Sequence, residues 1–136
     1  MIKINNGFVT NSSSTSYIIS SKNKKMFTKN DFLKLMGVKD ESILFETFEK
    51  LFYIIKQDAK PIENYLSDGT KIEDFLSRCS FSDKEIQEIC KRYKNGESVF
   101  YGRLEDAGSP EEIYFCYQSF ILVNDDFYFN AEVDAY

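Results

Sequence analysis

The sequence contains no histidine and no tryptophan among its 136 residues. Without an imidazole, the chain cannot build a Ser-His-Asp triad, a Cys-His pair or a zinc site with histidine ligands. Its three cysteines, Cys79, Cys90 and Cys116, are odd in number and far apart. They predict neither a disulfide framework nor a tetrahedral zinc set, but inert thiols in a reducing compartment. The sequence therefore predicts no metal site and no cofactor.

Long apolar runs and a secretory signal are missing too. No stretch of about 18 apolar residues exists, which argues against a transmembrane helix. One lysine followed by polar Asn5-Asn6-Gly7 does not form a signal-peptide pattern. We therefore expect a cytoplasmic protein of a bacterial host cell that does not associate with membranes. The length fits a single domain over residues 1–136.

Aromatic residues and short β-type runs are present instead. The 13 Phe and 9 Tyr are expected to dominate the core. Strand-like runs lie at residues 8–10, 17–19, 98–104, 113–123 and 127–133. The run 113–123 is apolar on both alternating faces, which is typical of a central strand covered on both sides. In 127–133, apolar residues alternate with Tyr128, Asn130 and Glu132, which predicts a half-buried strand.

Between these runs, the sequence has several helix-start signals. Thr28, Thr70 and Ser82 each precede an acidic residue by three positions and so predict capping boxes. Further helices are expected from about Asp40 and from Thr70. The whole pattern predicts an α+β domain whose antiparallel sheet is built from N-terminal and C-terminal strands, with about four helices between them.

The most unusual segment is a run of six small polar residues between two apolar runs: Asn11, Ser12, Ser13, Ser14, Thr15 and Ser16. We expect a loop or hairpin connection rich in hydroxyl-to-backbone hydrogen bonds. Two other interpretations are a loop that holds a phosphate or another anion, and a recognition segment for a partner or a processing enzyme. An anion site would need a glycine-rich nest, or a helix N-terminus with a nearby lysine or arginine, and neither follows directly in the sequence.

The opening Gly-Phe-Val-Thr-Asn-Ser-Ser-Ser-Thr-Ser-Tyr resembles the start of many small proteins from phages, mobile elements and Firmicutes-type bacteria. Their openings read Phe-Val-(Thr/Ser)-Asn-Ser-Ser-Ser-Ser-Ser-Phe. The match covers residues 8–17, with Thr15 and Tyr17 as departures. The resemblance implies a mobile-element context and no mechanism, since the group has no established activity.

Negative charge is concentrated at the end of the chain. Residues 97–136 contain nine acidic residues and one basic residue, Arg103. This balance argues against direct nucleic acid binding through that third, because phosphate contacts require positive charge. We expect a partner-binding surface there, with Glu105, Asp106, Glu111 and Glu112 steering association and with Tyr101 and Tyr128 as exposed anchors.

These observations predict a small acidic, non-enzymatic binding protein of phage or mobile-element type. Its partner is expected to be another protein, such as a host nucleic-acid enzyme of the CRISPR-effector kind, which it would inhibit. Two alternatives stay open. One is an enzyme acting on a nucleotide or phosphate ester through the Ser-rich loop and Lys22, Lys24 or Lys25. The other is a structural or assembly protein that forms oligomers through its sheet edge.

Overall fold

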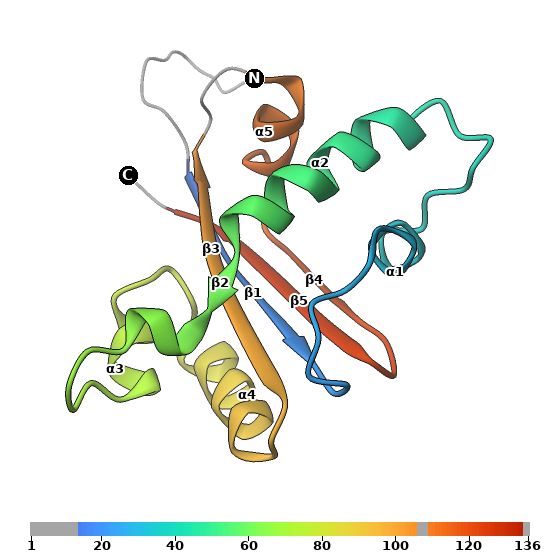
Figure 1. The fold of residues 1–136 in the computed structure, drawn as a ribbon. Coiled ribbons are helices and arrows are strands. Elements are labelled where there is room, and N and C mark those ends of the chain that lie inside the picture. Colours follow the sequence, from blue (N-terminus) through green and yellow to red (C-terminus); the bar gives the residue numbers. More distant parts are fainter. Residues whose placement is uncertain (1–13, 106–108, 135–136) are drawn as a thin grey trace, which may run out of the picture.

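The computed structural model describes residues 14–105 and 109–134, and for Ile113 it describes the backbone only. In chain order the elements are β1 (Ser14–Ser21), α1 (Lys29–Leu35), α2 (Phe45–Asp58), β2 (Lys60–Pro61), the 3₁₀ helix η1 (Ile62–Tyr65), α3 (Ile72–Ser77), α4 (Asp83–Lys94), β3 (Ser98–Glu105), α5 (Pro110–Phe115), β4 (Phe120–Val123) and β5 (Phe127–Val133). The described strands form a sheet in the order β2-β3-β1-β5-β4, with every neighbouring pair antiparallel (Figure 1). The predicted α+β fold is confirmed, since α1 to α4 lie between the N-terminal strand and the C-terminal strands.

β1 is the central strand of this sheet. It pairs with β3 from Ser14↔Glu105 to Ser21↔Ser98, and with β5 from Thr15↔Val133 to Ser21↔Phe127. All eight of its residues are buried. Because side chains alternate along a strand, Tyr17 and Ile19 belong to one face of the sheet and Ile18 to the other.

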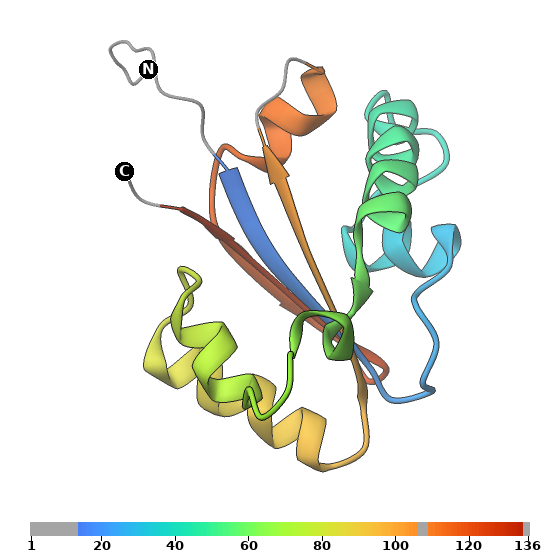
Figure 2. The ribbon, with the colours of Figure 1, turned by 60° about the vertical axis from the view of Figure 1, so that its left-hand side comes forward.

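Helices cover both faces of the sheet, which gives the molecule three layers (Figure 2). One face packs against α1, α2 and α5 through an aromatic-rich core that includes Phe32, Phe52, Phe115 and Phe129. The opposite face packs against η1, α3 and α4 through a smaller core that includes Ile62, Leu76, Ile89 and Tyr128. The expected dominance of aromatic side chains therefore holds for the first of the two cores.

Local capping signals predicted two helix starts correctly. The Thr28 and Ser82 hydroxyls accept from the backbone N–H groups of Asp31 and Glu85, and both capping boxes are complete. The other two predicted starts are wrong by a few residues. α2 begins at Phe45, and α3 begins at Ile72 without a side-chain cap. In the described part of the chain, no helix is both long enough and apolar enough to span a membrane.

The central strand predicted at 113–123 is wrong. This run contains the end of α5, a turn and the short edge strand β4. The helix begins where Ser109 caps the backbone N–H of Glu112, with Pro110 at the first helical position. These start signals were present in the sequence, but the apolar composition of the run does not distinguish a short buried helix from a strand.

We expect Gly102→Ala to lower the free energy of unfolding by about 1–3 kcal/mol, because the space that a Cβ atom would take is already occupied. Gly102 of β3 lies opposite Tyr17, and a Cβ atom there would collide with the Tyr17 ring and the Asp58 carboxylate. Urea denaturation measures the change. Ser98→Ala in the same strand is the control and should shift stability by no more than about 0.5 kcal/mol. Equal stability of the two variants would contradict this account of Gly102.

Candidate functional site

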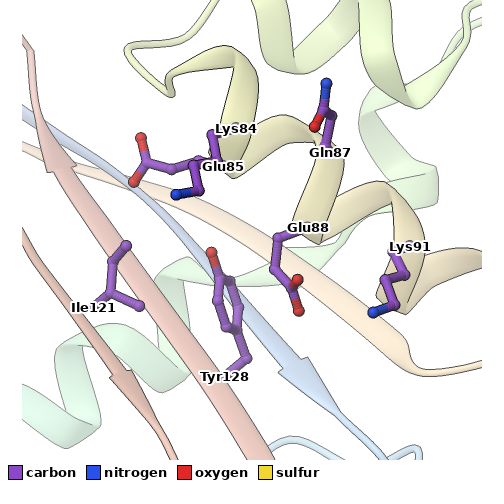
Figure 3. Close-up of a pocket in the computed structure, with 7 residues that line it drawn as sticks. All are labelled: Lys84, Glu85, Gln87, Glu88, Lys91, Ile121 and Tyr128. Carbon is purple, nitrogen blue, oxygen red and sulfur yellow. The ribbon is translucent and has the colours of Figure 1, made fainter.

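An open groove of about 580 Å³ lies between α4 and the β5–β4 edge of the sheet. Ile121 of β4 and Tyr128 of β5 form its sheet side (Figure 3). The helix side of the groove is lined by Lys84, Glu85, Gln87, Glu88 and Lys91. The groove thus combines an apolar floor with a wall that carries charge of both signs, as recognition sites commonly do.

Arg92 fixes α4 over this part of the sheet. Its guanidinium lies 4.5 Å from the centre of the Tyr128 ring, in a cation–π contact. It also forms ion pairs with Glu88 (2.7 Å) and Glu97 (3.3 Å). The Glu97 carboxylate in turn accepts a hydrogen bond from the Ser20 hydroxyl of β1. The groove wall is therefore tied to the central strand through a chain of polar contacts.

A pair of carboxyl groups, Glu85 and Glu132, meets at the end of the groove nearest the start of α4. They lie within hydrogen-bonding reach of each other, and like charges at that distance cannot both ionise easily. Burial, together with the hydrogen bond and negative charge of Glu85, raises the pKa of Glu132 to about 7. Burial also acts against ionisation of Glu85, but its hydrogen bonds outweigh burial and leave its pKa below the ordinary value. The pair therefore holds one proton between pH 5 and pH 7.

Asn130 of β5 donates a hydrogen bond to Glu85 of this carboxyl pair. It is fully buried, and its Nδ2 donates to Glu85 Oε2 (2.9 Å) and to Tyr128 Oη (2.8 Å). Its Oδ1 has no hydrogen-bond partner among the described residues. The prediction of a half-buried strand over 127–133 is therefore wrong for Tyr128 and Asn130, because α4 covers the face that the alternation assigned to solvent.

A second polar cluster is centred on Asp134, just after β5. Its carboxylate accepts hydrogen bonds from the hydroxyls of Ser14, Ser16 and Ser80, and pairs with Arg103 Nε at 3.2 Å. Arg103 also donates to Ser14 Oγ (2.9 Å). Burial opposes ionisation, but these donors outweigh it and hold the pKa of Asp134 below its ordinary value. The cluster joins the beginning of β1 to the end of β5.

This cluster corrects the prediction of a loop over Asn11–Ser16. Ser14, Thr15 and Ser16 belong to the central strand and are almost fully buried. They stay in the strand because their hydroxyls find partners: Asp134 for the two serines and the Phe115 carbonyl for Thr15 (3.4 Å). Asn11, Ser12 and Ser13 lie outside the described residues.

The two predicted tyrosine anchors are not exposed. Tyr101 packs edge-on against Tyr65 and Phe75, and its hydroxyl lies 3.3 Å from Ser16 Oγ. Tyr128 lies beneath Arg92. Both belong to the core between the sheet and α3–α4, so the prediction that they are surface anchors is wrong. Their pKa values are raised, mainly because burial disfavours the phenolate.

Three of the four predicted steering acids lie in the described part of the chain. Glu105 is exposed at the end of β3, and Glu111 and Glu112 are half-buried in the first turn of α5. Glu112 accepts a hydrogen bond from the Ser109 hydroxyl (2.7 Å), so one of these carboxylates also stabilises the helix start. Asp106 lies outside the described residues.

Exposed apolar side chains concentrate in the segment that follows these acids. Of the seven large hydrophobic side chains exposed in the described residues, four lie between residues 114 and 123. They are Tyr114, Tyr117, Ile121 and Val123, with Tyr117 the most exposed at 80%. Their exposure was not expected from the sequence, because the pattern over 113–123 predicted a buried strand.

In the described residues, the lysines of the alternative enzyme site lie far from the serine hydroxyls. Lys22, Lys24 and Lys25 follow the last residue of β1, whereas Ser14 and Ser16 stand at its beginning, roughly 20 Å away along an extended strand. Among residues 14–105 and 109–134, no three metal-ligating acids, cysteines or histidines gather at one point. The Ser14 hydroxyl instead accepts a hydrogen bond from Arg103, which is 89 residues away in the sequence.

These elements define an α+β protein with a central N-terminal strand, an open groove along one sheet edge and an Asp134-centred polar cluster. Comparison of the chain with protein-family models, with curated proteins and with solved structures finds no match in any of the three.

Asp134→Asn should lower the free energy of unfolding by about 1.5–3 kcal/mol, because the amide cannot accept all the hydrogen bonds of the carboxylate or pair with Arg103. Urea denaturation at pH 7 measures the loss. Asp125→Asn, in the exposed turn between β4 and β5, is the matched control and should leave stability within about 0.5 kcal/mol. If both variants lose the same amount, Asp134 does not fasten the two strands.

Glu132→Gln should make stability less dependent on pH. The folded pKa of Glu132 is raised from 4.5 to about 7, so the folded chain holds a proton that the unfolded chain releases. Wild-type stability should therefore fall as pH rises from about 4.5 through 7, whereas the variant should lose less and be the more stable protein at pH 8. Urea titrations from pH 5 to pH 8 test this, with exposed Glu41→Gln as the control. Parallel wild-type and Glu132→Gln curves would disprove the shared proton.

Proposed function

We propose that this protein acts by binding another protein through an acidic–aromatic face, defined as Glu105, Glu111, Tyr114 and Tyr117, and through the edge strand β4 that follows it in the chain. The concentration of exposed hydrophobic side chains in residues 114–123 is the observation that carries this proposal. Apolar groups that cluster on the surface of a soluble domain commonly mark an interaction site. Tyrosine suits such a site because it buries apolar area and keeps a polar hydroxyl.

The edge strand β4 adds a second surface, with Ile121 and Val123 on the α4 side of the sheet. No described strand pairs with its outer side, so its backbone can accept a further strand. Ile121 and Val123 are about half exposed on its surface, and Ile121 also lines the groove beside α4. A partner segment lying along β4 could therefore bury these side chains while it fills the groove.

Charge favours a partner with a basic surface. Glu105 and Glu111 contribute negative charge near the aromatic residues, and opposite potentials speed and orient association. Nucleic-acid-binding proteins carry basic surfaces of this kind. We infer that the protein occupies such a surface, as an inhibitor of a host nucleic-acid enzyme of the CRISPR-effector kind would. The resemblance of residues 8–17 to phage and mobile-element proteins supports this setting.

Self-assembly is the second candidate function. The open edge of β4 with two exposed aliphatic side chains could pair with the same strand of another copy. Light scattering of the purified chain distinguishes self-assembly from binding to a different protein. A monomer at micromolar concentration supports binding to a different protein, and a stable dimer or larger oligomer supports assembly.

Charge reversal on the acidic–aromatic face tests the proposed function. Glu105→Lys with Glu111→Lys should reduce recovery of a partner captured from the native host by about tenfold or more, because it removes steering and adds repulsion. Tyr117→Ala should also weaken capture, because it removes the most exposed aromatic anchor. Glu41→Lys with Asp68→Lys makes the same change in net charge at exposed sites elsewhere and should leave recovery unchanged. Equal recovery with all of these variants would overturn the proposal.

A further inference from the structure

A separate polar pocket of about 380 Å³ lies where the α3–α4 connection meets the sheet. Four parts of the chain line it: β1, the connection between α3 and α4, β3 and the residue after β5. The lining residues are Ser16, Arg78, Cys79, Ser80, Tyr101, Arg103 and Asp134. The pocket belongs to a different part of the molecule from the groove beside α4, since the two share no lining residue.

Two guanidiniums supply the hydrogen-bond donors of the pocket. Arg78 and Arg103 are exposed, whereas Ser16 and Tyr101 are nearly buried, and their hydroxyls bond to each other and, for Ser16, to Asp134. Arg103 is held in position by Asp134 and by the Ser14 hydroxyl. A preorganised guanidinium loses less conformational freedom when it binds a ligand.

The described lining residues do not balance in charge. Among them are two guanidiniums and one carboxylate, Asp134, which pairs with Arg103 and accepts from three serines. The Arg78 side chain, in contrast, has no ion pair or hydrogen bond to any described residue. The Arg78 guanidinium is therefore the positive charge that a ligand can neutralise.

The ionisable groups beside the arginines favour binding over proton transfer. Burial raises the pKa of the Tyr101 hydroxyl and of the Cys79 thiol, so both stay protonated at neutral pH. Asp134 is fully engaged as an acceptor. The lining therefore offers donors and positive charge, without an available base or nucleophile next to them.

We propose that this pocket binds the phosphate group of a small molecule, with Arg78 and Arg103 contacting its oxygens. Guanidinium groups match the geometry of phosphate through paired N–H donors. A volume of about 380 Å³ can hold a phosphate and a small organic group, but it does not fit a folded partner. In this pocket, Ser16 lies near Arg78 and Arg103, which are distant from it in the sequence.

Inorganic phosphate is the probe, and NMR of the isotope-labelled full chain is the measurement. We expect saturable shifts of the Arg78 Nε–H and Ser80 amide signals at constant ionic strength, with chloride as the reference anion. Arg78→Gln should weaken phosphate binding about tenfold. Lys71 lies at the start of α3 and Arg78 at its end. Lys71→Gln removes one positive charge from this exposed site and should leave phosphate binding within about twofold.

Three results would overturn the proposal. One is the absence of saturable shifts at these residues, and another is equal weakening by Arg78→Gln and Lys71→Gln, which would indicate general charge attraction. The third is acetate binding as tightly as phosphate, which would indicate a carboxylate site. Because Arg78→Gln lies outside the acidic–aromatic face, partner capture by this variant reports separately on the proposed function.

Discussion

The pairing of β1 with β3 on one side and β5 on the other is the constraint on which the rest of the structure depends. It places residues 14–21 between strands that lie 77 or more residues further on. β3 and β5 do not pair with each other, so the sheet and both helical layers are organised around β1. Burial of the whole strand then requires every polar group on it to find a partner inside the protein.

The two faces of β1 meet this requirement differently. On the face towards α1, α2 and α5, Tyr17 and Ile19 enter an aromatic core, and the Tyr17 hydroxyl donates to Asp58 at 2.7 Å. On the face towards α3 and α4, Ile18 enters the smaller core, whereas Ser14 and Ser16 hydrogen-bond to Asp134. The change from apolar to polar lining explains why this face has a packed end and a pocket-forming end.

Local signals were sufficient for part of the fold. The Thr28 and Ser82 capping boxes were predicted correctly, because a cap depends on residues only three positions apart. The prediction over 113–123 failed, because an apolar run is compatible with a buried strand and with a short helix followed by an edge strand. The same error placed Tyr114 and Tyr117 in a buried strand, although both are exposed. Tyr128 was expected at the surface because of the alternation over 127–133, but α4 covers that face.

The amino-acid sequence alone predicts the α+β class, helices between N-terminal and C-terminal strands, the acidic C-terminal third and the absence of any histidine chemistry. These properties follow from composition and from patterns within a few residues. Tertiary contacts set the rest: the serine tract enters the central strand, Glu85 meets Glu132, and Arg78, Arg103 and Asp134 line one pocket. Each of these depends on contacts between segments distant in sequence, whose register is fixed by sheet pairing and burial and leaves no local signal.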